Sequence, residues 1–201
     1  MNSHKRAAPD HPIHDLIEKR WSPYAFTSQA VSVTELQSLF EAARWAASSY
    51  NEQPWSYIVA TKSDPQAFDK LLSCLVEPNQ AWAKHAPVLA LGCTNHQFAK
   101  NDKPNAAAEH DLGLASAGLT FEATARGLVV HQMIGILPDR AREVYSIPDS
   151  VEALTALAIG YAAAAETLPD ALRQRDLAPR TRKPLADFVF HGSWGTPSEF
   201  E

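Results

Sequence analysis

A loop of small hydroxyl and amide side chains is the first stretch of this sequence whose residue types could bind a ligand. It runs from Ser48 to Trp55 and carries only one charged side chain, Glu52. Its candidate ligand-binding residues are Ser48, Ser49, Asn51 and Gln53. Neutral donors and acceptors of this kind suit the edge of a heteroaromatic ring, which offers both. An ordinary polar surface loop is the alternative, and the residue chemistry alone favours it.

Two separate groups of cations occur in the sequence, and the first of them, at residue 20, could bind a phosphate. Arg20 and Ser22 follow a short helix that is predicted from residue 11 to residue 20, and the neighbouring Trp21 and Tyr24 could cover a ring. Far along the chain, Arg180 and Arg182 lie in a run of three cations within four residues. The planar guanidinium group matches the geometry of phosphate oxygens. Solvated surface arginines are the alternative for both groups.

The polar loop lies between two elements that the sequence predicts clearly. Upstream, Ser32 and Glu35 have the spacing of a capping box, and the apolar residues that follow recur at helical spacing as far as Ala47. Downstream, residues 55–60 are aromatic and β-branched, which is typical of a strand. Pro54 favours extended geometry at the residue before it, so the strand is expected to start there.

These segments resemble the FMN-dependent nitroreductase family. Its members have a helix ending near A-x-x-A-P-S-S, followed by N-x-Q-P-W and a strand, and this pattern is matched by Ala43, Ala46, Ser48, Ser49, Asn51, Gln53, Pro54 and Trp55, with Ala47 in place of proline. The family's R-x-S-x-R/K segment is matched by Arg20 and Ser22, with Tyr24 in place of the second cation. Its G-L…H-Q-M-x-G-F segment is matched by Gly127, Leu128, His131, Gln132, Met133 and Gly135, with Ile136 in place of phenylalanine.

The resemblance implies a single α+β domain over residues 1–201, with a nitroreductase-like fold. We expect a central mixed, largely antiparallel sheet flanked by helices, in an intertwined homodimer whose tail from about residue 162 packs on the partner subunit. Two FMN sites would lie at the interface. The implied FMN-binding residues are Arg20, Trp21, Ser22, Tyr24, Ser48, Ser49, Asn51, Gln53, Gln132, Met133, Ile134, Gly135, Arg180 and Arg182. The arginines would bind the phosphate, Ser22 and the loop amides would bind polar flavin groups, and residues 132–135 would lie beside the ring.

The implied activity is that of an oxidoreductase in which NADH or NADPH delivers hydride to flavin N5. A small acceptor such as a nitroaromatic or a quinone is then reduced in a ping-pong mechanism. The cofactor carries this chemistry, so no catalytic side chain is expected. Two alternatives remain open: a flavin-binding module without steady turnover, and another activity of the superfamily, such as an enone reductase, a reductive dehalogenase or a flavin-degrading enzyme.

Composition excludes several other classes of protein. The net charge of −5 argues against non-specific nucleic-acid binding, which needs a basic surface. The polar segment from Met1 to His14 does not read as a signal peptide, and the apolar run near residues 153–165 is too short to span a bilayer. A cytoplasmic protein without membrane contact is therefore expected, with Cys74 and Cys93 as reduced core residues. His11 and His14 lack a third ligand, so no metal is expected.

The remaining elements were predicted from apolar runs and small residues. Buried strands are expected at residues 87–93, 128–134 and 154–161, a helix after the Asp64 cap, and a short strand at residues 188–190. A long helix from about residue 105 to residue 126 is rich in alanine and glycine. Such a surface permits close approach of another helix, either within the subunit or across a dimer interface. Phe98, in the polar loop 95–104, is a candidate substrate lid or a core residue.

Overall fold

The centre of the molecule is a four-stranded antiparallel sheet. The structure is a computed structural model that describes residues 5–198, so the two ends of the predicted domain lie outside the described residues. The strands are β1 (Trp55–Thr61), β2 (Val88–Asn95), β3 (Val129–Met133) and β4 (Val151–Gly160). Their order in the sheet is β1-β2-β4-β3, and each neighbouring pair is antiparallel. The α+β class and the four predicted core strands are confirmed, and β3 lies at one edge of the sheet.

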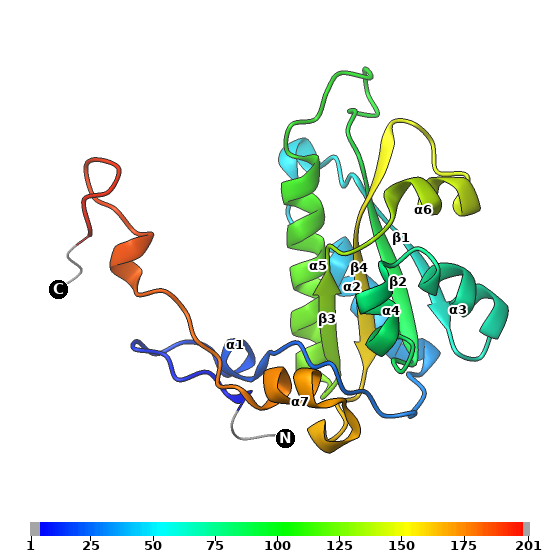
Figure 1. The fold of residues 1–201 in the computed structure, drawn as a ribbon. Coiled ribbons are helices and arrows are strands. Elements are labelled where there is room, and N and C mark those ends of the chain that lie inside the picture. Colours follow the sequence, from blue (N-terminus) through cyan, green and yellow to red (C-terminus); the bar gives the residue numbers. More distant parts are fainter. Residues whose placement is uncertain (1–4, 199–201) are drawn as a thin grey trace.

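Helices cover both faces of this sheet (Figure 1). On one face, α2 (Val33–Arg44) packs against α5 (Ala108–Ala125), and leucines of both helices are fully buried between them and the sheet. On the other face lie α3 (Pro65–Leu72), α4 (Glu77–Ala83) and α6 (Pro138–Tyr145), which pack around a second core containing Leu71, Leu75 and Trp82. Cys74 and Cys93 are buried free thiols, as predicted.

Local sequence explains where α2 begins and how closely it approaches α5. The Ser32 hydroxyl accepts the Glu35 N–H at 3.2 Å, and the Glu35 carboxylate accepts the Ser32 N–H at 2.8 Å, so the predicted capping box is present. A Cβ at Gly118 of α5 would lie 3.0 Å from the carbonyl oxygen of Ala42 in α2. This glycine is therefore needed for helix packing within the subunit, whereas a Cβ at Gly113 would meet nothing within 4 Å.

The C-terminal part of the chain differs from the expected tail. It contains η3 (Ala165–Thr167), α7 (Asp170–Leu177) and η4 (Leu185–Asp187), none of which was predicted. Residues 188–190 do not form the predicted strand, since Phe190 makes only an isolated bridge to Pro197, and no strand within residues 5–198 pairs with the segment. Helix α7 packs near the short helix α1 (Asp15–Lys19), while residues 178–198, here called the C-terminal arm, project away from the body (Figure 1).

No helix within residues 5–198 is long and apolar enough to cross a membrane.

Candidate functional site

Arg20, Arg180 and Arg182 form a cluster of cations beside the N-terminal helix. The Arg20 Nη1 donates a hydrogen bond to the Ser22 hydroxyl at 3.2 Å. Burial lowers the pKa of Arg20, and the nearby charges of Arg180 and Arg182 lower it further. The two arginine groups that the sequence separates by about 160 positions are thus brought within electrostatic reach of each other.

No carboxylate of the described residues pairs with the arginine cluster. Arg180 donates to the backbone carbonyls of Lys5 at 3.2 Å and Glu18 at 2.7 Å, while Arg182 donates to the carbonyl of Thr181. Within residues 5–198 none of the three arginines forms an ion pair with an acidic side chain. The Nε atom of Arg180 is buried without an acceptor in the same part of the chain. Such a group is suited to a multiply charged anion.

A cavity of about 220 Å³ adjoins Arg20 and Ser22 and leads to the edge strand β3. It is lined by Arg20, Ser22, Ala117, Thr120, Phe121, Val130 and Gln132. The Gln132 amide nitrogen donates to the Thr120 hydroxyl at 2.9 Å and to the Ser116 carbonyl at 3.2 Å, which fixes the orientation of the amide. Two of the predicted segments, around Arg20 and around Gln132, therefore meet in one cavity.

The segment after Gln132 shows three different environments. Met133 is buried in the core, whereas the Ile134 side chain is 81% exposed at the sheet edge. The Gly135 carbonyl accepts hydrogen bonds from the Val76 N–H at 3.1 Å and from the Asn79 amide at 2.9 Å. A Cβ at Gly135 would lie 2.5 Å from Asn79 Nδ2, so the packing of α4 already requires a glycine here. The sequence suggested a different reason, close approach to a flavin.

The predicted polar loop is a strained turn that side chains hold in place. Tyr50, Asn51 and Gln53 all have positive φ angles, of 55°, 57° and 52°. Non-glycine residues in this region cost free energy, and such strain is concentrated at functional sites. The Ser48 hydroxyl accepts the Gln53 N–H at 3.1 Å, and the buried Asp111 carboxylate accepts the Ser49 N–H at 3.0 Å. The buried carboxylate of Asp111 was not anticipated from the sequence.

A neighbouring loop supports the same turn. Glu52 accepts the N–H of Ala99 at 2.6 Å, and the Phe98 ring makes an edge contact with the Tyr50 ring at a centroid distance of 5.8 Å. Phe98 therefore packs on the candidate loop rather than in the main core. Whether it acts as a substrate lid stays a prediction.

The polar loop and the arginine cluster lie at different heights along α5. The loop is attached at Asp111, near the start of the helix, while the cavity beside Arg20 is lined by residues 117–121. Nine residues separate Asp111 from Thr120, which corresponds to about 13 Å along a helix. Within one chain, Ser48, Ser49, Asn51 and Gln53 therefore form one group, and Arg20, Ser22, Gln132, Arg180 and Arg182 form another.

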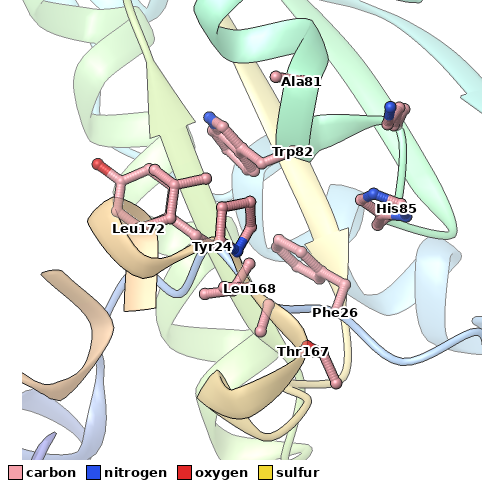
Figure 2. Close-up of a pocket in the computed structure, with 11 residues that line it drawn as sticks. Tyr24, Phe26, Ala81, Trp82, His85, Thr167, Leu168 and Leu172 are labelled. Atoms are coloured by element: carbon pink, nitrogen blue, oxygen red, sulfur yellow. The ribbon is translucent and has the colours of Figure 1, made fainter. Parts of the chain in front are cut away.

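Trp21 and Tyr24 point away from the cavity beside Arg20. Trp21 is buried, and the ammonium group of Lys5 lies 5.4 Å above its ring. The Tyr24 ring makes edge contacts with Trp82, at a centroid distance of 5.1 Å, and with His131, at 4.7 Å. Figure 2 shows Tyr24 and Trp82 among the residues of a second pocket beside α4. The structure therefore groups Tyr24 with aromatic residues, and its contact with a flavin stays a prediction.

Two polar groups, the buried Asp176 and the half-buried His131, hold the segment that carries Arg20 and Ser22. The Asp176 carboxylate accepts the N–H groups of Tyr24 and Ala25, and burial raises the pKa of this carboxyl. The His131 Nδ1 donates to the Pro23 carbonyl at 2.8 Å, and burial lowers the pKa of the imidazole. No motif pointed to either role, since both depend on contacts between residues more than 100 positions apart.

One group of potential metal ligands lies elsewhere among the described residues. Donor atoms of His96, Glu109 and Glu152 lie within 4.8 Å of one another. His96 and Glu152 bond to each other at 2.9 Å, with both side chains substantially exposed. His14, considered from the sequence, instead accepts the Leu16 N–H at the start of α1.

Together these features define an α+β protein with a cluster of three arginines beside a cavity at the edge of an antiparallel sheet. A sequence profile of the Nitroreductase family matches residues 17–161, and the chain belongs to this family. Its fold is the nitroreductase-like fold that was expected.

The chain is also similar to individual proteins. A solved structure described as an oxidoreductase containing FMN superimposes with a TM-score of 0.90 at 34% identity, covering 98% of this chain and 99% of that one. The structure of NfrA2 from B. megaterium has a TM-score of 0.69 at 25% identity, covering 89% of this chain and 73% of that one. An uncharacterised 15.4 kDa protein of Mycolicibacterium smegmatis is 32% identical over 126 residues, which is 63% of this chain and 84% of that protein.

Proposed function

We propose that this protein is an FMN-dependent oxidoreductase that takes hydride from NADH or NADPH and reduces a small acceptor such as a nitroaromatic or a quinone. The observation that carries the proposal is the cluster of Arg20, Arg180 and Arg182, which has no acidic partner among residues 5–198 and adjoins the cavity at Gln132. Family membership and the similar structure described as an FMN-containing oxidoreductase support the same assignment.

The residues of the cluster fit the phosphate of FMN. The buried Nε of Arg180 lacks an acceptor within residues 5–198, and a phosphate oxygen would supply one. Burial lowers the pKa of Arg20, repulsion from Arg180 and Arg182 lowers it further, and a bound dianion would offset that repulsion. Arg20, Arg180 and Arg182 would hold the phosphate, Ser22 would bind a neighbouring polar group, and residues 132–135 would lie beside the ring. When bound, FMN supplies the two-electron chemistry.

The separation of the loop from the arginine cluster supports a site built from two subunits. A second copy of the chain could bring its own Ser48–Gln53 loop to the cavity beside Arg20. The C-terminal arm has the apolar surface that such a dimer needs, since Leu185, Phe188 and Trp194 are 41%, 58% and 93% exposed. Exposed apolar side chains in this number are typical of interaction surfaces. We therefore propose a homodimer with flavin sites at its interface.

The chain's own side chains bind and orient reactants rather than transfer protons. Among the residues that line the cavity beside Arg20, the ionisable side chain is Arg20 itself, which stays charged at all ordinary pH values. We assign no general acid or base, and the donor nucleotide and acceptor would use the ring face in turn. The strained loop carrying Asn51 and Gln53 would supply neutral hydrogen bonds to the ring edge.

The test of flavin binding compares FMN with riboflavin, which lacks the phosphate. Purified protein should be yellow and release FMN on denaturation. Arg20→Ala and Arg182→Ala should each weaken FMN binding by about tenfold to a hundredfold, since a charge-assisted contact contributes about 1.5–3 kcal/mol. Riboflavin binding should change much less. Arg140→Ala, which removes an exposed arginine of α6, is the matched control. Equal losses for FMN and riboflavin would exclude a phosphate role.

The test of activity measures oxidation of NADH and NADPH by the FMN-loaded protein with nitroaromatic, quinone and enone acceptors. Parallel initial-rate lines in a double-reciprocal plot would support the ping-pong order. A stable yellow protein that turns over none of these acceptors would favour the flavin-binding module instead.

A further inference from the structure

A second pocket lies on the opposite side of β3 from the arginine cluster. It has a volume of about 430 Å³ and is formed by residues 24–26, by the end of α4, and by residues 167–172 at the start of α7. Figure 2 shows these three segments enclosing a common space. Binding sites for small molecules usually have volumes of about 300–1,000 Å³. The pocket is thus large enough for a ligand of one or two rings.

The two cavities are separated because consecutive residues of a strand point to opposite faces. The Gln132 side chain bonds to Ser116 and Thr120 of α5, on the arginine side. The neighbouring His131 contacts Tyr24 and Trp82, on the α4 side. A ligand in the second pocket would therefore leave the cavity beside Arg20 free.

The floor of the second pocket is aromatic. The Trp82 and Phe26 rings are nearly parallel, with an interplanar angle of 11° and centroids 6.3 Å apart, and Tyr24 meets Trp82 edge-on. Trp82 is 2% exposed and Phe26 is 7% exposed. Aromatic faces and edges favour offset or edge contacts with another flat ring. Tyr24, which replaces the cation expected from the family pattern, is one of the residues that make this surface.

The rim of the pocket is cationic. The eleven lining residues include Lys84 and His85 but no aspartate or glutamate. Burial lowers the pKa of His85, and the charges of Lys84 and Lys62 lower it further, so both lysines lie close enough to the imidazole to repel its charged form. A single permanent charge among the lining residues suits a monoanion better than the dianionic phosphate that the three arginines would bind. Carboxylate is the common monoanion of this kind.

From this floor and rim we propose that the pocket between α4 and α7 binds a planar aromatic carboxylate. The ring would pack against the half-buried Tyr24, with the buried Trp82 and Phe26 beneath it, and the carboxylate would lie at the exposed Lys84 and His85. The proposal concerns binding only and does not depend on the proposed flavin chemistry. It goes beyond that function because it places a second small-molecule site on the other face of the edge strand.

Isothermal titration of the full chain with 2-naphthoate, and with the neutral 2-naphthamide as its isostere, tests the proposal. The protein is used as purified and again after saturation with FMN. We expect one naphthoate per chain and at least tenfold weaker binding of the amide. Lys84→Met should remove that preference, and Leu172→Trp should fill the pocket and weaken both ligands. Lys103→Met, which removes an exposed lysine of the 96–105 loop, is the matched control.

Several outcomes would overturn the assignment. They are equal affinity for the acid and the amide, affinity unchanged in both Lys84→Met and Leu172→Trp, and displacement of naphthoate by FMN. Circular dichroism establishes that each variant is folded. As a second measurement, NMR titration of the His85 ring should show its pKa rising when naphthoate binds, because a carboxylate stabilises the charged imidazole. An unchanged His85 titration with bound naphthoate would place the ligand elsewhere.

Discussion

The Asp176 carboxylate accepts the backbone N–H of Tyr24 at 3.0 Å, which attaches α7 to the segment that carries Arg20 and Ser22. The same carboxylate accepts the N–H of Ala25, and Lys5 donates to the carbonyls at the end of α7. Arg180 follows α7 directly. One buried carboxylate therefore positions both halves of the arginine cluster.

Replacing Asp176 with asparagine should weaken FMN binding and reduce stability together. Hydrogen bonds to a charged group contribute about 1.5–3 kcal/mol, and the amide can accept at only one of its two atoms. We expect the free energy of unfolding to fall by about 1–3 kcal/mol in urea titrations, and the affinity for FMN to fall several-fold. Asp170→Asn, on the exposed side of the same helix, is the control. Unchanged FMN affinity in Asp176→Asn would show that α7 does not position the cluster.

Ending the chain after Arg182 tests the outer part of the C-terminal arm separately from the arginine cluster. This truncation keeps all three arginines but removes the exposed Leu185, Phe188 and Trp194. Sedimentation equilibrium should show a shift from dimer to monomer. FMN binding should weaken because a monomer lacks the Ser48–Gln53 loop that the other subunit would contribute. A truncated chain that remains a dimer with unchanged FMN affinity would show that the arm is not part of the interface.

Gly135→Ala should destabilise the protein through a clash with α4. The new Cβ would lie 2.5 Å from Asn79 Nδ2 and 2.9 Å from Val76, and overpacking of this kind costs about 1–3 kcal/mol. Adding Asn79→Ala to the Gly135→Ala variant should restore part of the lost free energy of unfolding. Gly113→Ala, where a Cβ meets nothing within 4 Å, should instead stabilise α5 by up to about 1 kcal/mol. Urea denaturation gives the free energy of unfolding of the wild type, the two single glycine variants and the double variant. Equal effects at the two glycines would contradict the packing argument.

His131 should make stability depend on pH below neutrality. Burial lowers its pKa in the folded state, so the unfolded chain binds the proton first. The contribution of the neutral imidazole to the free energy of unfolding is fully present above the unfolded pKa of about 6.5, and it is lost as pH falls towards the folded pKa. Urea titrations between pH 7.5 and pH 5 should show the free energy of unfolding falling in the wild type and falling less in His131→Gln. His191→Gln, on the exposed arm, should behave like the wild type. A His131→Gln curve parallel to the wild type would show that another group titrates.

The sequence by itself determined the local elements and the types of residue at the site. The capping box at Ser32, the apolar run from Val88 and the β-branched strand after Pro54 are short-range signals, and each element formed where it was predicted. The cation groups and the polar loop were identified for the same reason, because their chemistry is visible in the side chains themselves. Helix α7 escaped prediction because it has few apolar residues, and residues 188–190 have strand composition without a strand to pair with.

Only the tertiary structure decided which of these residues meet. Arg20 joins Arg180 and Arg182 because Asp176 and Lys5 tie the two ends of the chain together, a contact that no periodicity records. The direction of Tyr24 follows from packing on Trp82 and His131, and the need for glycine at position 135 follows from Asn79. Long-range contacts of this kind depend on how whole elements pack. The residue types therefore identify the components of the candidate site, and the packing of the helices and strands determines how those components are arranged.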